Sequence, residues 1–123
     1  MGAEGYRELR VWHAARDLAG DMYQATDTGS LARDFGRQDQ MRRAAASIPS
    51  NIAEGDERGT NKDSVRFWHM AKGSLPELRT RLEIARDVGS LNPETHQTLE
   101  GRCAELGRML GALIKARTTT HTP

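Results

Sequence analysis

The feature that most constrains the fold is a spacing of three and four residues between apolar side chains, which recurs in four segments. This spacing places the apolar side chains on one face of an α-helix. No segment alternates between apolar and polar residues as a half-buried strand does, so we predict an all-α fold. The four apolar seams are Leu9, Trp12, Ala15, Ala19, Met22 and Tyr23; Met41, Ala45, Ile48 and Ile52; Trp68, Ala71, Leu75, Leu78, Leu82 and Ala85; and Leu99, Cys103, Leu106, Leu110 and Leu113.

Glycine, proline and capping residues separate the seams and predict helices over about residues 8–27, 37–57, 61–88 and 93–117. Thr60 and Asp63 form a capping box before the third helix, and Asn92-Pro93 begins the fourth. Long helices joined by short connections predict an antiparallel up-down-up-down four-helix bundle. We expect one domain over residues 1–123, with a frayed tail at 118–123.

Composition bears on the compartment and on the partners. Cys103 is the single cysteine, so an internal disulfide is excluded and a cytoplasmic location is expected. We also expect no signal peptide and no membrane span, since no apolar run approaches the roughly 20 residues that a span needs. The formal net charge is +1, so the chain as a whole is not a polycation.

Several residues off the seams indicate close approach by another helix or subunit. Pro49 lies inside the second predicted helix, where it removes a backbone hydrogen bond. Gly107-x-x-x-Gly111 leaves room for a neighbouring helix, and small residues surround Pro49. We predict structural or interface roles for this set: Pro49, Asn51, Glu54, Gly55, Gly73, Gly107 and Gly111.

Basic residues on the polar faces are candidates for binding nucleic acid. Of the 18 basic residues only Lys62, Lys72 and Lys115 are lysines, and arginine suits bidentate contacts to phosphate. A GC-rich genome would produce the same bias. Lys72, Arg79 and Arg86 repeat every seven residues beside the third seam, where pairing with acids of a neighbouring helix is expected. The candidate phosphate-binding residues are Arg43, Arg58, Lys62, Arg66, Arg102, Arg108 and Lys115.

The sequence contains none of the catalytic or metal-binding motifs that would indicate an enzyme. None of the four histidines (His13, His69, His96 and His121) has a partner at a metal-binding spacing, and His96 falls in register with the fourth seam. Cys103 lies on that seam, as a small apolar residue would. Neither a phosphate-binding loop nor a nucleophile elbow is present. We therefore predict no catalytic activity, no metal and no cofactor.

Several motifs resemble a known family. They are Arg10-Val11-Trp12, the long stretch from Gln40 to Gly55 that contains Ala44-Ala45-Ala46-Ser47-Ile48-Pro49-Ser50-Asn51-Ile52-Ala53-Glu54, then Ala71-Lys72-Gly73-Ser74-Leu75-Pro76-Glu77-Leu78, and Gly89-Ser90-Leu91. Over about residues 6–115 the chain is similar to the four-helix-bundle family whose founding members are encoded in intervening sequences of bacterial 23S ribosomal RNA. The resemblance implies a homopentameric ring. A related branch consists of accessory proteins of diversity-generating retroelements, which bind nucleic acid and the reverse transcriptase.

The chain departs from the family pattern in three ways. Arg37-Gln38-Asp39-Gln40 replaces the usual Leu-Thr-Ser-Gln, which weakens the expected N-cap of the second helix. Pro76 is not the usual residue after Gly-Ser-Leu. The retroelement accessory proteins are strongly basic, whereas this chain carries +1.

Two functions follow as hypotheses. The first is a non-catalytic oligomeric adaptor that binds the phosphate backbone of RNA or DNA, in one version as an accessory to a retroelement reverse transcriptase. The alternative is a protein-binding scaffold with no nucleic-acid role, in which the charges join subunits. The discriminating observation is whether the arginines gather on one exposed face or pair with acids such as Glu54, Asp56, Glu57, Glu77 and Glu83.

Overall fold

The computed structural model describes residues 5–119, and this part of the chain contains four α-helices and no strand. The helices are α1 (Arg10–Ala25), α2 (Phe35–Asp56), α3 (Asn61–Asp87) and α4 (Pro93–Thr119). Two short 3-10 helices, Gly5–Glu8 and Gly29–Ala32, lie before α1 and between α1 and α2. The predicted all-α class is confirmed.

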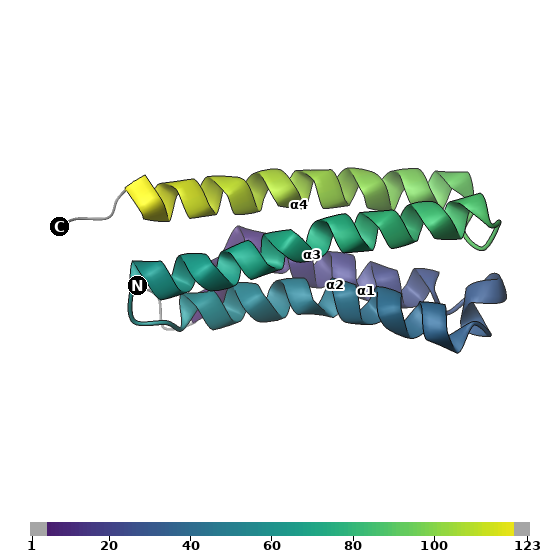
Figure 1. The fold of residues 1–123 in the computed structure, drawn as a ribbon, viewed down its shortest axis with the longest axis horizontal. Coiled ribbons are helices and arrows are strands. Elements are labelled where there is room, and N and C mark those ends of the chain that lie inside the picture. Colours follow the sequence, from purple (N-terminus) through teal and green to yellow (C-terminus); the bar gives the residue numbers. More distant parts are fainter. Residues whose placement is uncertain (1–4, 120–123) are drawn as a thin grey trace.

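The helices lie lengthwise beside one another (Figure 1). Their backbones pack in the cyclic order α1, α2, α3, α4 and back to α1, and among the described residues the diagonal pairs α1–α3 and α2–α4 do not come close. The α1–α2 and α3–α4 connections lie at one end of the molecule, which we call the α3–α4 end, and the α2–α3 connection lies at the other. At the α3–α4 end the two connections are joined by a hydrogen bond of 3.0 Å between the hydroxyls of Ser30 and Ser90.

The start of α2 corrects the expectation from sequence. The helix begins at Phe35, two residues before position 37, because Asp34 caps it. The Asp34 carboxylate accepts a hydrogen bond of 3.2 Å from the backbone N–H of Arg37. An acidic N-cap of this kind satisfies one of the donors that the first helical turn leaves free. The cap therefore comes from a residue just upstream of the segment where the family pattern places it.

Other helix ends differ from the expected positions by up to two residues. The segment Gly5–Glu8 forms its own 3-10 helix, so α1 begins at Arg10, two residues after position 8. The helix α4 continues through Thr119, and its last turn is helical where a frayed tail was expected. The Thr118 hydroxyl donates a hydrogen bond of 2.7 Å to the Ile114 carbonyl in that turn. The rest of the expected tail, residues 120–123, lies outside the described residues.

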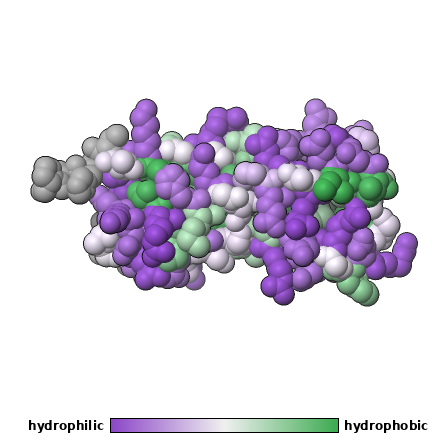
Figure 2. Space-filling view, in the orientation of Figure 1, coloured by the Kyte–Doolittle hydropathy of each residue, from purple (hydrophilic) through white to green (hydrophobic). Residues whose placement is uncertain are grey.

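The predicted seams face inward and form one core. The largest fully buried side chains include Met22, Met41, Ile48, Trp68 and Leu78. Tyr23 is an exception: it was expected on the first seam, yet 46% of it is exposed, and its ring centre lies 4.6 Å from the guanidinium carbon of Arg42. The side of the molecule seen in Figure 2 is mostly hydrophilic, with scattered hydrophobic patches.

Both internal prolines are accommodated inside continuous helices, Pro49 in α2 and Pro76 in α3. Each follows a serine by two positions, and these serines meet: the Ser47 and Ser74 hydroxyls are 2.8 Å apart. Ser74 also lies within hydrogen-bond distance of the Met70 carbonyl, at 3.3 Å. The two helices, each of which lacks a backbone donor at its proline, are thus joined by one side-chain hydrogen bond about half a turn before the prolines.

None of the helices in residues 5–119 combines the length and the apolar character that crossing a membrane would require.

Candidate interaction surfaces

The residues with metal-binding or nucleophilic side chains are dispersed or buried in the described part of the chain. Within residues 5–119, no three His, Cys, Asp or Glu side chains come together in a way that could hold a metal ion. Cys103 is fully buried, and this burial, together with the nearby Glu100 carboxylate, raises the pKa of its thiol to about 11. A thiol in this environment stays protonated and unreactive at neutral pH. His96 is 9% exposed, as expected of a core histidine.

Four of the seven basic candidates pair with acids of the same chain. Arg43 contacts Asp39 at 2.7 Å within α2, and Arg108 contacts Glu105 at 2.6 Å within α4. Arg58 pairs with Glu54, and Arg102 of α4 pairs with Asp21 of α1. Exposed pairs of this kind contribute only about 0–1 kcal/mol each, but they neutralise the local positive charge.

The heptad row on α3 behaves partly as predicted. Arg79 reaches across to α4, where its Nε donates a hydrogen bond of 2.9 Å to Glu100. This contact raises the pKa of Arg79 above its usual value. Arg86 instead pairs within α3, with Glu83 at 3.6 Å and with Asp87 at 2.9 Å. Interhelical pairing is therefore confirmed for Arg79 and wrong for Arg86.

Three of the basic candidates come together at the α2–α3 end. The guanidinium carbons of Arg58 and Arg66 lie 4.5 and 4.6 Å from the centre of the Phe67 ring. Lys62 is exposed one turn before Arg66. We call Arg58, Lys62, Arg66 and Phe67 the basic aromatic cluster. Arg43, Arg102, Arg108 and the exposed Lys115 lie on other parts of α2 and α4, so the structure does not gather all seven into one patch.

Gly55 is required by packing inside the chain. It lies in the last turn of α2, buried against Trp68 of α3, whose indole N–H donates a hydrogen bond of 3.1 Å to the Ile52 carbonyl. A Cβ at position 55 would lie 2.5 Å from Trp68 Nε1 and 2.9 Å from the Ser64 carbonyl oxygen. The indole therefore occupies the space that any other residue would need. The sequence identified Gly55 but not Trp68 as its partner.

The other residues of the long motif also serve α2 itself. The Asn51 amide donates a hydrogen bond of 2.8 Å to the Ser47 carbonyl, one turn back and close to Pro49. Glu54 holds Arg58 at the end of the helix. The motif that carries the family resemblance therefore shapes α2 and its contact with α3, and these side chains do not converge on a pocket.

The remaining predicted glycines have no comparable role inside the chain. A Cβ at Gly73 would meet no atom within 4 Å. At Gly107 it would lie 3.5 Å from Leu75 Cδ1, and at Gly111 it would lie 3.8 Å from Lys72 Cε, both ordinary contact distances. Close approach between helices of this chain therefore does not explain these three glycines.

Sequence reasoning missed a polar contact between α1 and α2. Arg42 donates hydrogen bonds of 2.8 Å to the Thr26 hydroxyl and 3.0 Å to the Tyr23 carbonyl. Gln38, one turn earlier on α2, donates a hydrogen bond of 2.8 Å to the Thr26 carbonyl. These side chains satisfy carbonyls that the C-terminus of α1 leaves free. The only sequence signal was two polar residues four positions apart, which many exposed helices share.

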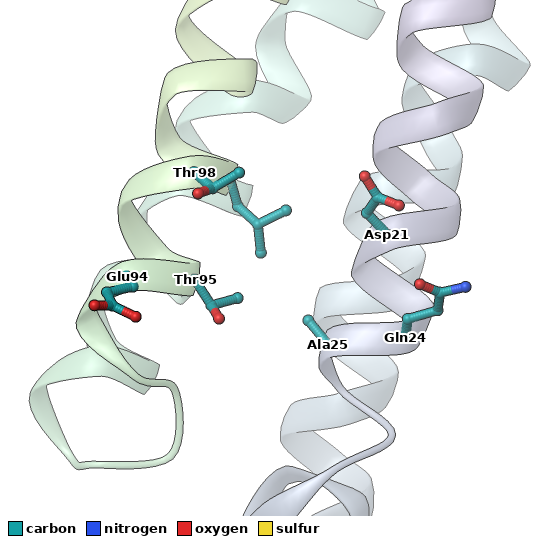
Figure 3. Close-up of a pocket in the computed structure, with 7 residues that line it drawn as sticks. Asp21, Gln24, Ala25, Glu94, Thr95 and Thr98 are labelled. Carbon is teal, nitrogen blue, oxygen red and sulfur yellow. The ribbon is translucent and has the colours of Figure 1, made fainter.

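Two shallow grooves lie at the α3–α4 end. The first, about 420 Å³, lies between α1 and α4. Figure 3 shows it with Asp21 and Gln24 on α1 and with Glu94, Thr95 and Thr98 on α4. We call it the α1/α4 groove, and Ala25 and Leu99 complete its lining. The second, the α2/α3 groove, has a volume of about 370 Å³. Its lining residues are Asp34, Gly36, Arg37, Gln40, Arg81 and Ile84.

Large apolar side chains remain exposed on α3 and at the start of α2. On α3, Met70 is 49% exposed, Ile84 47% and Val88 57%, and Phe35 at the first position of α2 is 73% exposed. Scattered exposed apolar residues are normal, but Ile84 and Val88 lie one turn apart at the end of α3 and form a continuous feature. We call this pair the α3 ridge. It lies at the same end of the molecule as the two grooves.

The arrangement of the helices defines the class of protein: an all-α fold in which four long helices share one core. The family model of the 23S rRNA-intervening sequence protein matches residues 7–112, and the chain belongs to this family. The resemblance found in the sequence motifs is thereby confirmed.

The fold is shared with a solved structure. A crystal structure from Bacteroides thetaiotaomicron, described as a protein with unknown function from the S23 ribosomal protein family, superposes with a TM-score of 0.78. It is 19% identical in sequence, and the match covers 85% of this chain and 98% of that one. At this identity the likeness shows the fold alone. No curated protein matches the chain.

Proposed function

We propose that the protein is a non-catalytic, homo-oligomeric scaffold that binds other proteins and has the antiparallel up-down-up-down bundle as its subunit. The observation that carries this proposal is the contrast on its surface. Four of the seven candidate phosphate-binding residues are neutralised by acids of the same chain, whereas Ile84, Val88 and Met70 are left exposed. Most of the candidate arginines therefore pair with acids instead of gathering on one exposed face. Their positive charge is then not available to a polyanion such as nucleic acid.

Packing inside the chain leaves room for such a partner. Gly73 lies on an exposed face with open space around it, although a glycine inside a helix costs about 1 kcal/mol relative to alanine. Burying the exposed half of an isoleucine or methionine contributes on the order of 1 kcal/mol, so several such residues per subunit support association. From the resemblance to the family we expect the oligomer to be a homopentameric ring. We expect it to be located in the cytoplasm.

Light scattering across a concentration series tests the oligomer. The expected result is a defined mass that is a multiple of the 13.7 kDa chain. A monomer of constant mass at tens of micromolar would refute the proposal. Protein partners would then be sought with the purified oligomer as bait, with a heat-unfolded sample as the matched control.

A second function, nucleic-acid binding, is favoured by the basic aromatic cluster. The guanidinium carbons of Arg58 and Arg66 both lie within 4.6 Å of the centre of the Phe67 ring, and the exposed Lys62 lies one turn before Arg66. Cationic side chains beside an aromatic ring suit a phosphate backbone with unstacked bases. In a ring this cluster would be repeated once per subunit, so that a modest monomer charge presents a larger basic surface. Arg58, which pairs with Glu54, and the remaining candidates (Arg43, Arg102, Arg108 and Lys115) would contact phosphate only after exchanging their present interactions.

The second function is tested by binding to fluorescent structured RNA and duplex DNA across a salt series. Replacing Lys62 and Arg66 by alanine is expected to weaken binding and to lower the salt slope by about one for each phosphate that is no longer neutralised. Replacing the exposed Arg33, at the opposite end of the bundle, is the matched control and should change neither. Absence of binding by the native protein at low salt would exclude this function. A reverse transcriptase partner, the retroelement version, would be tested by co-purification.

A further inference from the structure

A second set of aromatic rings and arginines lies at the α2–α3 end of the bundle, where α1 begins (Figure 1). The rings of Tyr6 and Trp12 have their centres 5.0 Å apart and are tilted by 58°. The guanidinium carbon of Arg7 lies 4.9 Å from the centre of the Tyr6 ring, and that of Arg16 lies 5.3 Å from the centre of the Trp12 ring. We call these four residues the N-terminal aromatic cluster.

This cluster and the basic aromatic cluster border the same turn at the C-terminus of α2. The 3-10 helix Gly5–Glu8, which carries Tyr6, packs against α2 as well as α1. A Cβ at Gly5 would lie 3.4 Å from the Glu57 carboxylate, and the next residue, Arg58, reaches the Phe67 ring. Rings from the start of the chain and from the start of α3 therefore flank one short segment.

Some cations at this end are unpaired within the described residues. Four basic side chains there form no ion pair with any residue of 5–119: Arg7, Arg10, Lys62 and Arg66. Carboxylates lie at the same end, namely Glu8, Asp56, Glu57 and Asp63. The net charge of this end is therefore small, and phosphate contacts alone would hold a nucleic acid weakly. Selectivity then depends on what the rings add.

Aromatic rings with guanidinium groups beside them favour a single strand over a duplex. The bases of a duplex are already stacked on one another, whereas those of a single strand can stack on an aromatic ring or on a guanidinium plane. Tyr6, Trp12 and Phe67 are each partly exposed, so a base can reach them. A guanidinium on an exposed ring is held only weakly, so a base can take its place while the arginine turns to a phosphate.

We propose that the α2–α3 end binds single-stranded nucleic acid in preference to duplex. The bases stack on the N-terminal aromatic cluster and on the Phe67 ring, and Arg7, Lys62 and Arg66 contact the phosphates. This inference rests on the second proposed function, nucleic-acid binding, and specifies its site and the form of its ligand. It adds the N-terminal aromatic cluster, none of whose members is among the seven basic candidates.

Variants that remove a ring test the stacking without changing the charge. Tyr6→Leu and Phe67→Leu keep an apolar side chain but lose the flat aromatic face. Tyr23→Leu is the matched control, because the Tyr23 ring centre also lies 4.6 Å from a guanidinium carbon, that of Arg42, but at the opposite end of the bundle. Trp12 is left in place in these variants because it packs against the core. Circular dichroism and thermal melting establish that each variant is folded.

Binding is measured for a labelled single strand and for the same strand annealed to its complement, first as DNA and then as RNA. The native protein should bind the single strand more tightly than the duplex. Tyr6→Leu and Phe67→Leu should each weaken single-strand binding by about 5- to 150-fold, the range for loss of one stacked base. Their salt slope should stay unchanged, since no cation is removed. Neither variant should alter duplex binding, and Tyr23→Leu should alter neither affinity.

Tryptophan fluorescence provides a second readout that uses the native protein. The chain has two tryptophans, of which Trp68 is fully buried and Trp12 is partly exposed in the N-terminal aromatic cluster. Because a stacked base quenches indole fluorescence, the unlabelled single strand should quench Trp12 and the duplex should not. Trp12→Phe keeps an aromatic ring, so it should still bind the single strand while the quenching is lost.

The outcomes separate this inference from the function on which it rests. A native protein that binds none of these nucleic acids at low salt refutes both. Equal affinity for single strand and duplex overturns the inference and leaves nucleic-acid binding standing. Single-strand binding that does not quench Trp12 or that survives Tyr6→Leu and Phe67→Leu has the same consequence, as does a Tyr23→Leu variant that binds as weakly as Phe67→Leu.

Discussion

Replacing Gly55 by alanine should destabilise the protein even though alanine is the better helix former. The added Cβ would lie 2.5 Å from Trp68 Nε1 and 2.7 Å from Cδ1, and 2.9 Å from the Ser64 carbonyl oxygen. Ordinary contacts between such atoms are longer than about 3.4 Å, so the indole or the α2–α3 spacing has to move by nearly 1 Å. Trp68 is fully buried, so it has no free space into which to move.

The magnitude follows from three contributions. Overpacking of this kind costs about 1–3 kcal/mol. Displacing the indole also weakens its hydrogen bond to the Ile52 carbonyl, which contributes about 1 kcal/mol. The gain in helix propensity from glycine to alanine offsets about 1 kcal/mol. The expected net loss is about 1–3 kcal/mol, or a melting temperature lower by about 4–12 °C for a chain of this length.

Urea unfolding followed by circular dichroism and by tryptophan fluorescence measures this effect. It should be done at two protein concentrations, because association would add to the apparent stability. Gly73→Ala is the matched control: the same substitution inside a helix, at a site with open space, should stabilise the subunit by up to about 1 kcal/mol. If Gly55→Ala is as stable as the native protein or more so, the packing of Trp68 does not restrict position 55 to glycine.

Three further predictions concern single side chains. Asp34→Ala should cost about 0.5–2 kcal/mol by removing the cap of α2, whereas Asp39→Ala, which breaks only an exposed ion pair, should cost under about 1 kcal/mol in the same urea titration. Arg42→Met keeps the aliphatic stem but removes the hydrogen bonds to the end of α1, so amide exchange in the last turn of α1 should become faster while α3 is unaffected. The Cys103 thiol has a pKa raised to about 11 in the folded state, against an ordinary value of 9.0, so its burial favours folding below that ordinary value and the benefit disappears as the pH rises toward 11. Stability should fall more steeply over this interval for the native protein than for Cys103→Ala, and equal slopes would contradict the assignment.

The helices and most of their inward-facing residues could be predicted from the sequence. The spacing of Met41, Ile48, Trp68 and Leu78 marked faces that are fully buried in the structure, because a helix must cover an apolar stripe wherever it packs. The long motif from Gln40 to Gly55 indicated the family, since so many unusual residues in one order leave few alternatives. The start of α2 was misplaced because a cap depends on the conformation of one residue, and Asp34 lies outside the periodic segment.

The partners of individual side chains, in contrast, depend on how the helices pack. Nothing in the spacing connects Gly55 to Trp68 or Ser47 to Ser74, because these contacts depend on the depth at which α2 and α3 pack. The same holds for the charges: Arg102 pairs with Asp21 of another helix, although the two residues lie far apart in the sequence. Helical periodicity fixes the face on which a side chain lies, whereas the register and rotation of neighbouring helices fix its partner. The grooves and the α3 ridge at the α3–α4 end follow from that register.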